Sequence, residues 1–319
     1  MTVETRRISR RAAVAALSAG TVALLTAACS QIPTGSSLVA PAAPAAKGGT
    51  IPKMLNVSII PAEDGDAMLK RFQPLMDYLK QALGMDVKGF AGADYTAAVE
   101  AMRAKKVEMG FFGPFSYLLA VEMAGARPVV MPGTAEGKPN TYHSLILAGG
   151  GTDIKSLEDL RGKSFSFSDP ASTSGNLIPR SIIVKAGLDP EKDMRPIFAG
   201  GHDASILAVH NGKVDAGACA DSQYNRMIEA KVIDPNKLRL VVKSEPIPNS
   251  PVAMREDIDQ GFRDRVRDAL LAAHETLPGD LMKAVVGGEK NRYIPADDSL
   301  YNPLRETARL LKLDLKALQ

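Results

Sequence analysis

Three hydroxyl residues and a glycine follow a strand-like segment near the middle of this 319-residue chain. Residues 168–177 read Ser-Asp-Pro-Ala-Ser-Thr-Ser-Gly-Asn-Leu, and the apolar run that follows, residues 177–184, predicts a helix. At a helix start, the hydroxyls of Ser172, Thr173 and Ser174 would lie beside backbone N–H groups that lack a helical acceptor. Such donors, together with the helix dipole, favour an oxyanion and in particular a phosphorus oxyanion. The alternative is that Ser172 or Ser174 is only a helix N-cap.

The elements around this segment alternate between strand and helix, which predicts an α/β protein with mostly parallel sheets. Apolar patterning predicts strands at 55–60, 87–90, 107–112, 129–131, near 197, up to 220 and at 238–242, and helices at 67–83, 95–105, 116–124, 203–210 and 258–275. The sequence Ser-Leu-Glu-Asp at 156–159 resembles a capping box.

Two lobes are expected, because roughly 265 residues remain after the N-terminal 50 and exceed one comfortable core. Residues 51–144 and 246–319 would form the first lobe and residues 145–245 the second. The chain would cross between them near 142–148 and near 242–252, so that the cleft can close about a hinge. In α/β sheets, ligands bind beyond the carboxyl ends of strands. The candidate residues follow predicted strands in this way: Phe112, Ser172, Thr173, Ser174, His202 and Asp221.

The N-terminal residues predict export. Four arginines between positions 6 and 11 precede an apolar run at 12–28, which is too short for a lasting membrane span and is typical of a signal peptide. The sequence Leu-Thr-Ala-Ala-Cys at 25–29 resembles a lipobox, so Cys29 is expected to be lipidated and to become the mature N-terminus. Residues 29–50 are rich in Pro, Ala, Gly and Ser and predict a flexible tether. The pair Arg10-Arg11 leaves both the general and the twin-arginine export routes open.

Composition excludes several classes of function. The net charge is +3 and basic residues are scattered, so nucleic acid is not an expected partner. The chain has no tryptophan and only 5% aromatic residues, which argues against stacking on sugars or bases. With Cys29 used for the lipid, Cys219 has no disulfide partner and is expected to be a buried apolar residue. No spacing of ligand residues indicates a metal, and no cofactor is expected.

Taken together in their order and spacing, several stretches resemble the PhnD-like family, the phosphate-, phosphite- and phosphonate-binding lipoproteins of ABC importers. This family is a branch of the type II periplasmic binding proteins, which consist of two α/β lobes joined by two hinge crossings. The resemblance covers nearly the whole mature chain. The stretches are 94–95, 111–118, 142–144, 156–163, 169–175, 201–203 and 211–217.

The resemblance implies a set of ligand-binding residues. Ser172, Thr173 and Ser174 would bind the phosphorus oxygens through hydroxyls and helix N–H groups. His202 would donate from the facing loop, although it is equally interpreted as a structural histidine that caps the next helix. A further three residues would line the first-lobe side of the cleft: Tyr95, Tyr142 and Phe112.

Asp221 is the residue that discriminates between ligands, because an unpaired carboxylate beside an anion is unfavourable. It becomes useful if it accepts a hydrogen bond from a protonated ligand or pairs with a ligand ammonium. Asn249 and Ser250 stand at the second crossing where an acid would help to hold an amine, and Tyr224 could narrow the pocket. A small oxyanion, phosphite or methylphosphonate, is therefore the favoured ligand, with 2-aminoethylphosphonate and phosphate as alternatives.

The hypothesis from sequence is a monomeric, lipid-anchored receptor of the periplasm or cell envelope that performs no chemistry. It would capture a small phosphorus oxyanion, close, and deliver the ligand to an inner-membrane ABC permease. An alternative of another class is an anchored serine hydrolase with Ser172, His202 and Asp221 as its triad, although Ser172 lacks the Gly-x-Ser-x-Gly elbow. A solute sensor that passes its closed form to a membrane receptor also remains open.

Overall fold

The computed structural model of the chain describes residues 48–313. These residues belong to one compact unit, Ala45–Gln319. The predicted signal peptide, Cys29 and nearly all of the predicted tether lie outside the described residues. Within residues 48–313, no helix is long and apolar enough to cross a membrane.

The larger of the two main sheets has six strands in the order β13-β4-β12-β3-β1-β2. Its strand β1 pairs in parallel with β2 and β3, whereas β12 and β13 join antiparallel to their neighbours. The strands are β1 (Leu55–Ile59), β2 (Val87–Ala91), β3 (Met109–Phe111), β4 (Ala126–Gly133), β12 (Val252–Arg255) and β13 (Arg292–Pro295).

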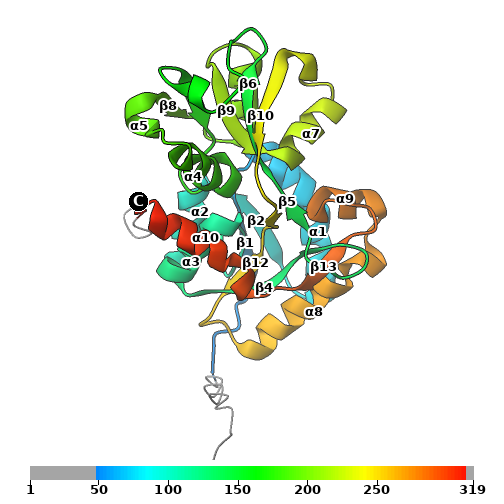
Figure 1. Cartoon of the computed structure of the whole chain (residues 1–319). Helices are drawn as coiled ribbons and strands as arrows, with labels where there is room; N and C mark the ends of the chain where they lie inside the picture. The colour runs from blue at the N-terminus through cyan, green and yellow to red at the C-terminus, as the bar shows by residue number, and fades with distance from the viewer. Residues whose placement is uncertain (1–47, 314–319) are drawn as a thin grey trace, which may run out of the picture. The chain divides into compact units, whose positions relative to one another are not determined.

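Helices cover both faces of this sheet (Figure 1). Helices α1 and α8 pack on one face against Leu55, Val57 and Ile59, and helices α2, α3 and α10 pack on the other. Alternation along β1 explains this division, because successive side chains point to opposite faces of a sheet. The helices of this lobe are α1 (Gly65–Leu83), α2 (Tyr95–Arg103), α3 (Pro114–Ala124), α8 (Gln260–Thr276), α9 (Gly279–Val286) and α10 (Asn302–Leu310), preceded by a 3₁₀ turn at Asp298–Tyr301.

Helix α1 illustrates how the sequence sets an element. Met68, Phe72, Leu75, Met76 and Leu79 recur at helical spacing and are all buried. The Asp64 carboxylate caps the start by accepting from the Ala67 N–H at 2.9 Å, and Gly84 ends the helix in the left-handed conformation at φ 65°. The helix therefore has an apolar face fixed against the sheet and defined ends.

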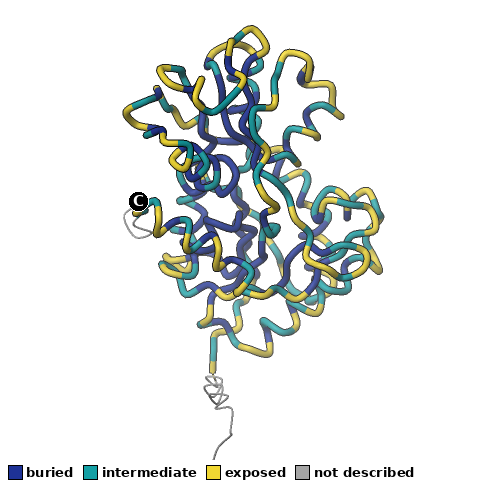
Figure 2. Tube along the Cα trace, viewed as in Figure 1, coloured by how far each residue is buried: buried dark blue, intermediate teal, exposed yellow. Residues whose placement is uncertain are grey.

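The smaller sheet has five strands in the order β10-β6-β9-β7-β8. Its inner strands are buried along their length (Figure 2). The strands are β6 (Ser144–Gly149), β7 (Ser164–Phe167), β8 (Arg195–Phe198), β9 (Ala216–Ala220) and β10 (Leu238–Lys243). The helices are α4 (Ile178–Lys185), α5 (Pro190–Asp193), α6 (His202–His210) and α7 (Asp221–Glu229), with 3₁₀ turns at Glu158–Leu160 and Pro235–Lys237.

The two-lobed α/β fold predicted from the sequence is confirmed, but its sheets are mixed rather than mostly parallel. Strand β6 runs antiparallel to both β9 and β10, and β7 runs parallel to β8 and β9. Residues 144–148 were expected to be an extended crossing, and they form β6, whose six residues are all buried. The apolar run Leu-Ile-Leu-Ala suits an inner strand, which is covered on both faces.

Two short strands connect the main sheets. β5 (Thr141–Tyr142) precedes β6, β11 (Ile247–Pro248) follows β10, and the two pair antiparallel, with Ile247 opposite Tyr142. The predicted capping box at 156–159 starts only a 3₁₀ turn. Its Asp159 carboxylate accepts from the N–H groups of Lys155 and Ser156 at 2.9 Å.

Gly217 allows α6 to pack closely on β9. A Cβ atom at this position would lie 2.9 Å from Val209 Cγ2 and 3.0 Å from both Ser166 O and Ser205 Oγ. Because α6 begins at His202, this close approach also fixes the position of that histidine at the end of the smaller sheet.

We expect Gly217→Ala to lower the free energy of unfolding by about 1–3 kcal/mol, the usual effect of overpacking. Gly151→Ala is the matched control, because a Cβ atom there would contact nothing within 4 Å. Urea denaturation of both variants checks this, and equal stabilities would contradict the packing role of Gly217.

Candidate functional site

A small cavity of about 100 Å³ lies where the carboxyl ends of β7 and β9 face the first lobe. Its lining comes from both lobes and from the connecting strands. Six of the nine residues predicted from the sequence line this cavity: Tyr95, Tyr142, Ser172, Thr173, Ser174 and His202. The structure therefore brings most of the predicted site residues to one place.

The hydroxyl segment consists of residues 172–174. It leads into a single π-helical turn, Thr173–Leu177, which continues directly into α4. The Leu177 N–H donates to the Ser172 carbonyl at 3.0 Å, five residues back, and Ser172 Oγ accepts from the Gly175 N–H at 3.1 Å. Ser172 is thus a helix N-cap, which was the alternative interpretation of the sequence. Its Oγ accepts in this role, so the hydroxyl hydrogen can still be donated to another group. The N–H groups of Thr173 and Ser174 lie in the first turn, where a helix supplies no acceptor.

Thr173 contacts the first lobe. Its Oγ1 accepts from the Phe115 N–H at 2.8 Å, in the first turn of α3. The Thr173 oxygen therefore caps a helix of the other lobe, while its hydroxyl hydrogen can still be donated into the small cavity. Sequence reasoning missed this contact because the two residues are 58 positions apart.

Tyr95 is the first residue of α2 and is 1% exposed. Its backbone N–H donates to Asp169 Oδ2 at 3.3 Å, so the helix start is tied to the loop that leads into the hydroxyl segment. Burial raises the pKa of the Tyr95 phenol well above its usual value. The Tyr95 Oη atom is buried and makes no hydrogen bond within residues 48–313, although the nearby Ser172 hydroxyl opposes part of the rise in its pKa.

Tyr142 stands on the connecting strand β5 and is partly buried. Burial raises the pKa of its phenol to about 12, and the neighbouring hydroxyls of Thr173 and Ser174 oppose part of that rise. The phenol therefore stays protonated at neutral pH and can donate a hydrogen bond.

His202 is held as a neutral donor. Its Nδ1 lies 2.9 Å from Ser168 Oγ and 3.2 Å from the Ala220 N, and the latter N–H can only donate. Nδ1 must therefore accept, which assigns the ring hydrogen to Nε2. Burial lowers the pKa of His202 to about 4, so the ring is uncharged at neutral pH.

Three predicted residues lie elsewhere. Asp221 and Phe112 line a second, larger cavity of about 620 Å³, and the Asp221 carboxylate contacts His143 Nδ1 at 3.0 Å. Tyr224 lines neither of these two cavities and packs beside the buried cluster that contains Cys219 and Met227. The prediction that Tyr224 narrows the pocket is not supported, because its side chain faces the apolar side of α7.

The residues of the hydrolase alternative do not form a triad. His202 Nδ1 bonds Ser168 and Ala220, whereas the Asp221 carboxylate bonds His143. No acid within residues 48–313 orients the His202 ring, so His202 lacks the acid partner that a Ser172 triad requires.

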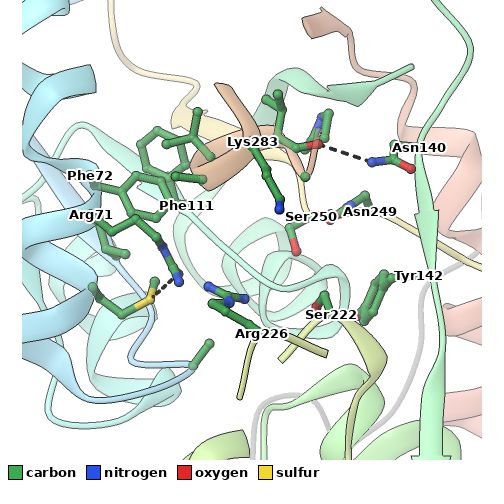
Figure 3. Close-up of a pocket in the computed structure, with 18 of the residues that line it drawn as sticks. Arg71, Phe72, Phe111, Asn140, Tyr142, Ser222, Arg226, Asn249, Ser250 and Lys283 are labelled. Carbon is green, nitrogen blue, oxygen red and sulfur yellow. Dashed lines mark hydrogen bonds between the residues drawn. The ribbon is translucent and has the colours of Figure 1, made fainter. Parts of the chain in front are cut away.

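Sequence reasoning missed the cations of the site. Arg71 and Arg226 line both cavities and Lys283 lines the larger one; all three reach into it from different elements (Figure 3). Glu63 contacts Arg71 and lies 3.5 Å from Arg226 Nη1. The spacing of Ser222 and Arg226, one helical turn apart after a strand end, is the signal that could have found Arg226.

The depressed pKa of His202 predicts a stability effect with a defined sign. The unfolded chain takes up a proton near pH 6.5 and the folded chain only near pH 4, so stability is lost as the pH falls through that window. As the pH falls through this window, we expect the free energy of unfolding of the wild type to decrease by about 3 kcal/mol more than that of His202→Asn. The amide oxygen of the asparagine can replace Nδ1 as an acceptor.

The comparison between variants is needed because Asp169 titrates in the opposite direction. Burial raises the pKa of Asp169 to about 6, so protonation of this carboxyl group increases the free energy of unfolding as the pH falls. This contribution is common to both proteins and cancels in the difference. Urea denaturation at several pH values from 7 to 4 measures the difference in free energy of unfolding between the wild type and His202→Asn. Parallel curves of stability against pH for the two proteins would rule out a buried neutral His202.

Comparisons with known proteins identify the family. Residues 57–301 match the family model described as "ABC transporter, phosphonate, periplasmic substrate-binding protein". The chain is 36% identical over 262 residues to the "Phosphate-import protein PhnD" of Mycolicibacterium smegmatis, which covers 79% of each chain. It is 28% identical over 223 residues to the "Phosphonates-binding periplasmic protein" of Escherichia coli, covering 68% of this chain and 65% of that protein.

A solved structure supports the fold. The structure of PhnD1 from Prochlorococcus marinus in complex with methylphosphonate superposes with a TM-score of 0.74 at 23% identity, covering 82% of this chain and 98% of that chain. Membership of this kind implies a phosphonate-type ligand and a membrane permease as partner, and it implies transport rather than catalysis. The chain belongs to the phosphonate-binding family of periplasmic substrate-binding proteins of ABC transporters.

Proposed function

We propose that this protein captures a small phosphorus oxyanion in the small cavity and delivers it to an inner-membrane ABC permease. The observation that carries the proposal is the buried Tyr95 hydroxyl, which lines this cavity without a partner in the described chain. A buried donor left unpaired costs about 1–3 kcal/mol. A ligand oxygen that accepts from Tyr95 would remove this cost.

The other groups that face the small cavity are also donors. The hydroxyls of Ser172, Thr173 and Ser174 come from the second lobe, and His202 offers its Nε2–H. Phosphite and phosphonates carry three oxygens on a tetrahedral phosphorus and phosphate carries four, so these anions suit donors that converge from several directions. Helix N–H groups of the first turn add to the attraction for an anion.

The environment of Asp221 favours a ligand without an amine. Its carboxylate is engaged by His143 and lines the larger cavity instead of the small one. Asn249 and Ser250, which line both cavities, supply no negative charge for an ammonium group. We therefore favour phosphite or methylphosphonate, and the name of the mycobacterial relative makes phosphate the principal alternative. 2-Aminoethylphosphonate remains the alternative that needs Asp221.

The proposal includes the anchor and the hinge. Cys29 would carry the lipid, and residues 29–50 would tether the folded unit to the membrane. The lobes, residues 51–144 with 246–319 and residues 145–245, would close about the paired strands β5 and β11. The folded unit would act as a monomer.

Tyr95→Phe tests the site directly. We expect the affinity for the phosphorus oxyanion to fall about tenfold or more, because the variant loses one hydrogen bond to a charged acceptor. Its stability without ligand should stay equal or rise, since an unpaired buried hydroxyl is removed. Tyr78→Phe is the matched control: Tyr78 Oη donates to Ala269 O at 2.8 Å and lines neither cavity. Calorimetry that finds equal affinities in both variants would refute the assignment of Tyr95.

A ligand panel tests the chemical class. The chain from about residue 48, stripped of ligand by unfolding and refolding, is titrated with phosphite, methylphosphonate, phosphate, 2-aminoethylphosphonate and sulfate. A ligand at a hundredfold its Kd adds about 2.7 kcal/mol, which raises the Tm by several degrees. We expect phosphite or methylphosphonate to stabilise most. Preference for the aminophosphonate would assign Asp221 to an amine, and no response to any phosphorus ligand would refute the proposal.

A further inference from the structure

The large cavity is continuous with the small one. Residues that line both include Ile60, Tyr142, Ser222 and Asn249. Its volume of about 620 Å³ lies within the range of about 300–1,000 Å³ that is typical of sites for organic molecules. A free oxyanion in the small cavity would leave this space without a ligand group.

One wall of the large cavity is apolar. Phe72 and Phe111 meet edge to face, with ring centroids 4.9 Å apart, and both line the cavity (Figure 3). Ile59, Pro132 and Val252 extend this wall. A carbon chain or ring on the ligand would therefore find an apolar surface next to the small cavity.

Two buried donors in the large cavity are without partners. Tyr293 is 2% exposed, and its Oη has no hydrogen-bond partner among the described residues. Arg71 contacts Glu63 and Met68 through its terminal nitrogens, but its buried Nε is likewise unpaired within residues 48–313. The phenol hydrogen of Tyr293 and the Nε–H of Arg71 each need a hydrogen-bond acceptor, and Tyr293 Oη can in addition accept a hydrogen bond.

The carboxylates that line the large cavity are already engaged or solvated. Glu229 lies 3.3 Å from Lys283 Nζ, and Asp221 contacts His143. Asp280 is exposed. An ammonium group on the ligand would thus add a donor to a cavity whose unpaired buried groups are donors.

We propose that the large cavity binds the substituent of an organophosphorus ligand, and that this substituent carries an oxygen acceptor such as a carboxylate. The proposal rests on the proposed function, in which the phosphorus oxyanion group occupies the small cavity. The substituent would lie along Phe72 and Phe111 and would accept a hydrogen bond from Tyr293. Phosphonates with an oxygen-bearing chain would then bind more tightly than the phosphite or methylphosphonate favoured above, which would bind through the small cavity alone.

Four ligands of graded structure test this by calorimetry: methylphosphonate, propylphosphonate, 3-phosphonopropionate and 3-aminopropylphosphonate. We expect 3-phosphonopropionate to bind about tenfold tighter than propylphosphonate, the effect of one hydrogen bond to a charged acceptor. The amine should bind no tighter than propylphosphonate. Equal affinities of the first three ligands, or preference for the amine, would overturn the proposal.

Tyr293→Phe assigns the effect to one atom. This variant should lose the advantage of 3-phosphonopropionate over propylphosphonate, keep its affinity for methylphosphonate, and remain as stable as the wild type without ligand. Tyr95→Phe should weaken all four ligands alike. If methylphosphonate binds and the carboxylate gives no advantage, only this inference fails. If no phosphorus ligand binds, the proposed function fails with it, and an advantage that survives Tyr293→Phe refutes the role of Tyr293.

Discussion

The hydrogen bond from the Phe115 N–H to Thr173 Oγ1, 2.8 Å long, joins the two lobes at the point on which the site depends. Helix α3 starts after Gly113, which has no side chain to cap it, so the second lobe supplies the cap. Two further bonds cross beside it: the His202 N–H donates to the Ala62 carbonyl at 3.0 Å, and the Tyr95 N–H donates to Asp169. Each satisfies a backbone donor at the beginning of a helix with an acceptor from the other lobe. These bonds hold the hydroxyl segment, His202 and Tyr95 together around one cavity.

The proposed site combines neutral donors in the small cavity with two cations, Arg71 and Arg226, that line both cavities. Arg71 and Arg226 share the carboxylate of Glu63, which also accepts from Gln223 Nε2 at 2.9 Å. Burying unpaired cations would carry a large desolvation cost, whereas hydroxyls and a neutral imidazole cost less to bury. In the proposed site, the orientation of donors would therefore matter more than net charge in deciding which anion fits. The shared Glu63 keeps the local positive charge low while α1 and α7 remain connected across the lobes.

Much of this structure could be predicted from the sequence, and the parts that could not have physical reasons. Local periodicity placed most helices and strands, because an amphipathic helix such as α1 records its buried face in its own residues. The antiparallel direction of β6 and β12 was not predictable, since strand direction depends on partners distant in the sequence, such as Ala220 opposite Ser144 and Phe111 opposite Val252. The hydroxyl segment and His202 were found because they follow strand ends. Arg71 was missed because it stands beside the apolar face of α1. Tyr224 lies on the apolar side of α7, whereas Ser222 and Arg226, two positions before and after it, line the cavities.

The π-helical turn at Thr173–Leu177 determines the direction in which the hydroxyls of the site point relative to α4. Successive residues of an α-helix are rotated by about 100° about the helix axis. The extra residue of a π turn therefore rotates the side chains before the turn by that angle relative to the side chains after it. Here the offset separates the cavity-facing hydroxyls of Ser172 and Thr173 from the buried face of α4, which includes Ile183. Loss of one residue from this turn would leave the helix and the core intact but would rotate the hydroxyls away from the cavity. The position of these hydroxyls in the small cavity thus depends on a single count of residues, and shortening this turn would move them out of the proposed site.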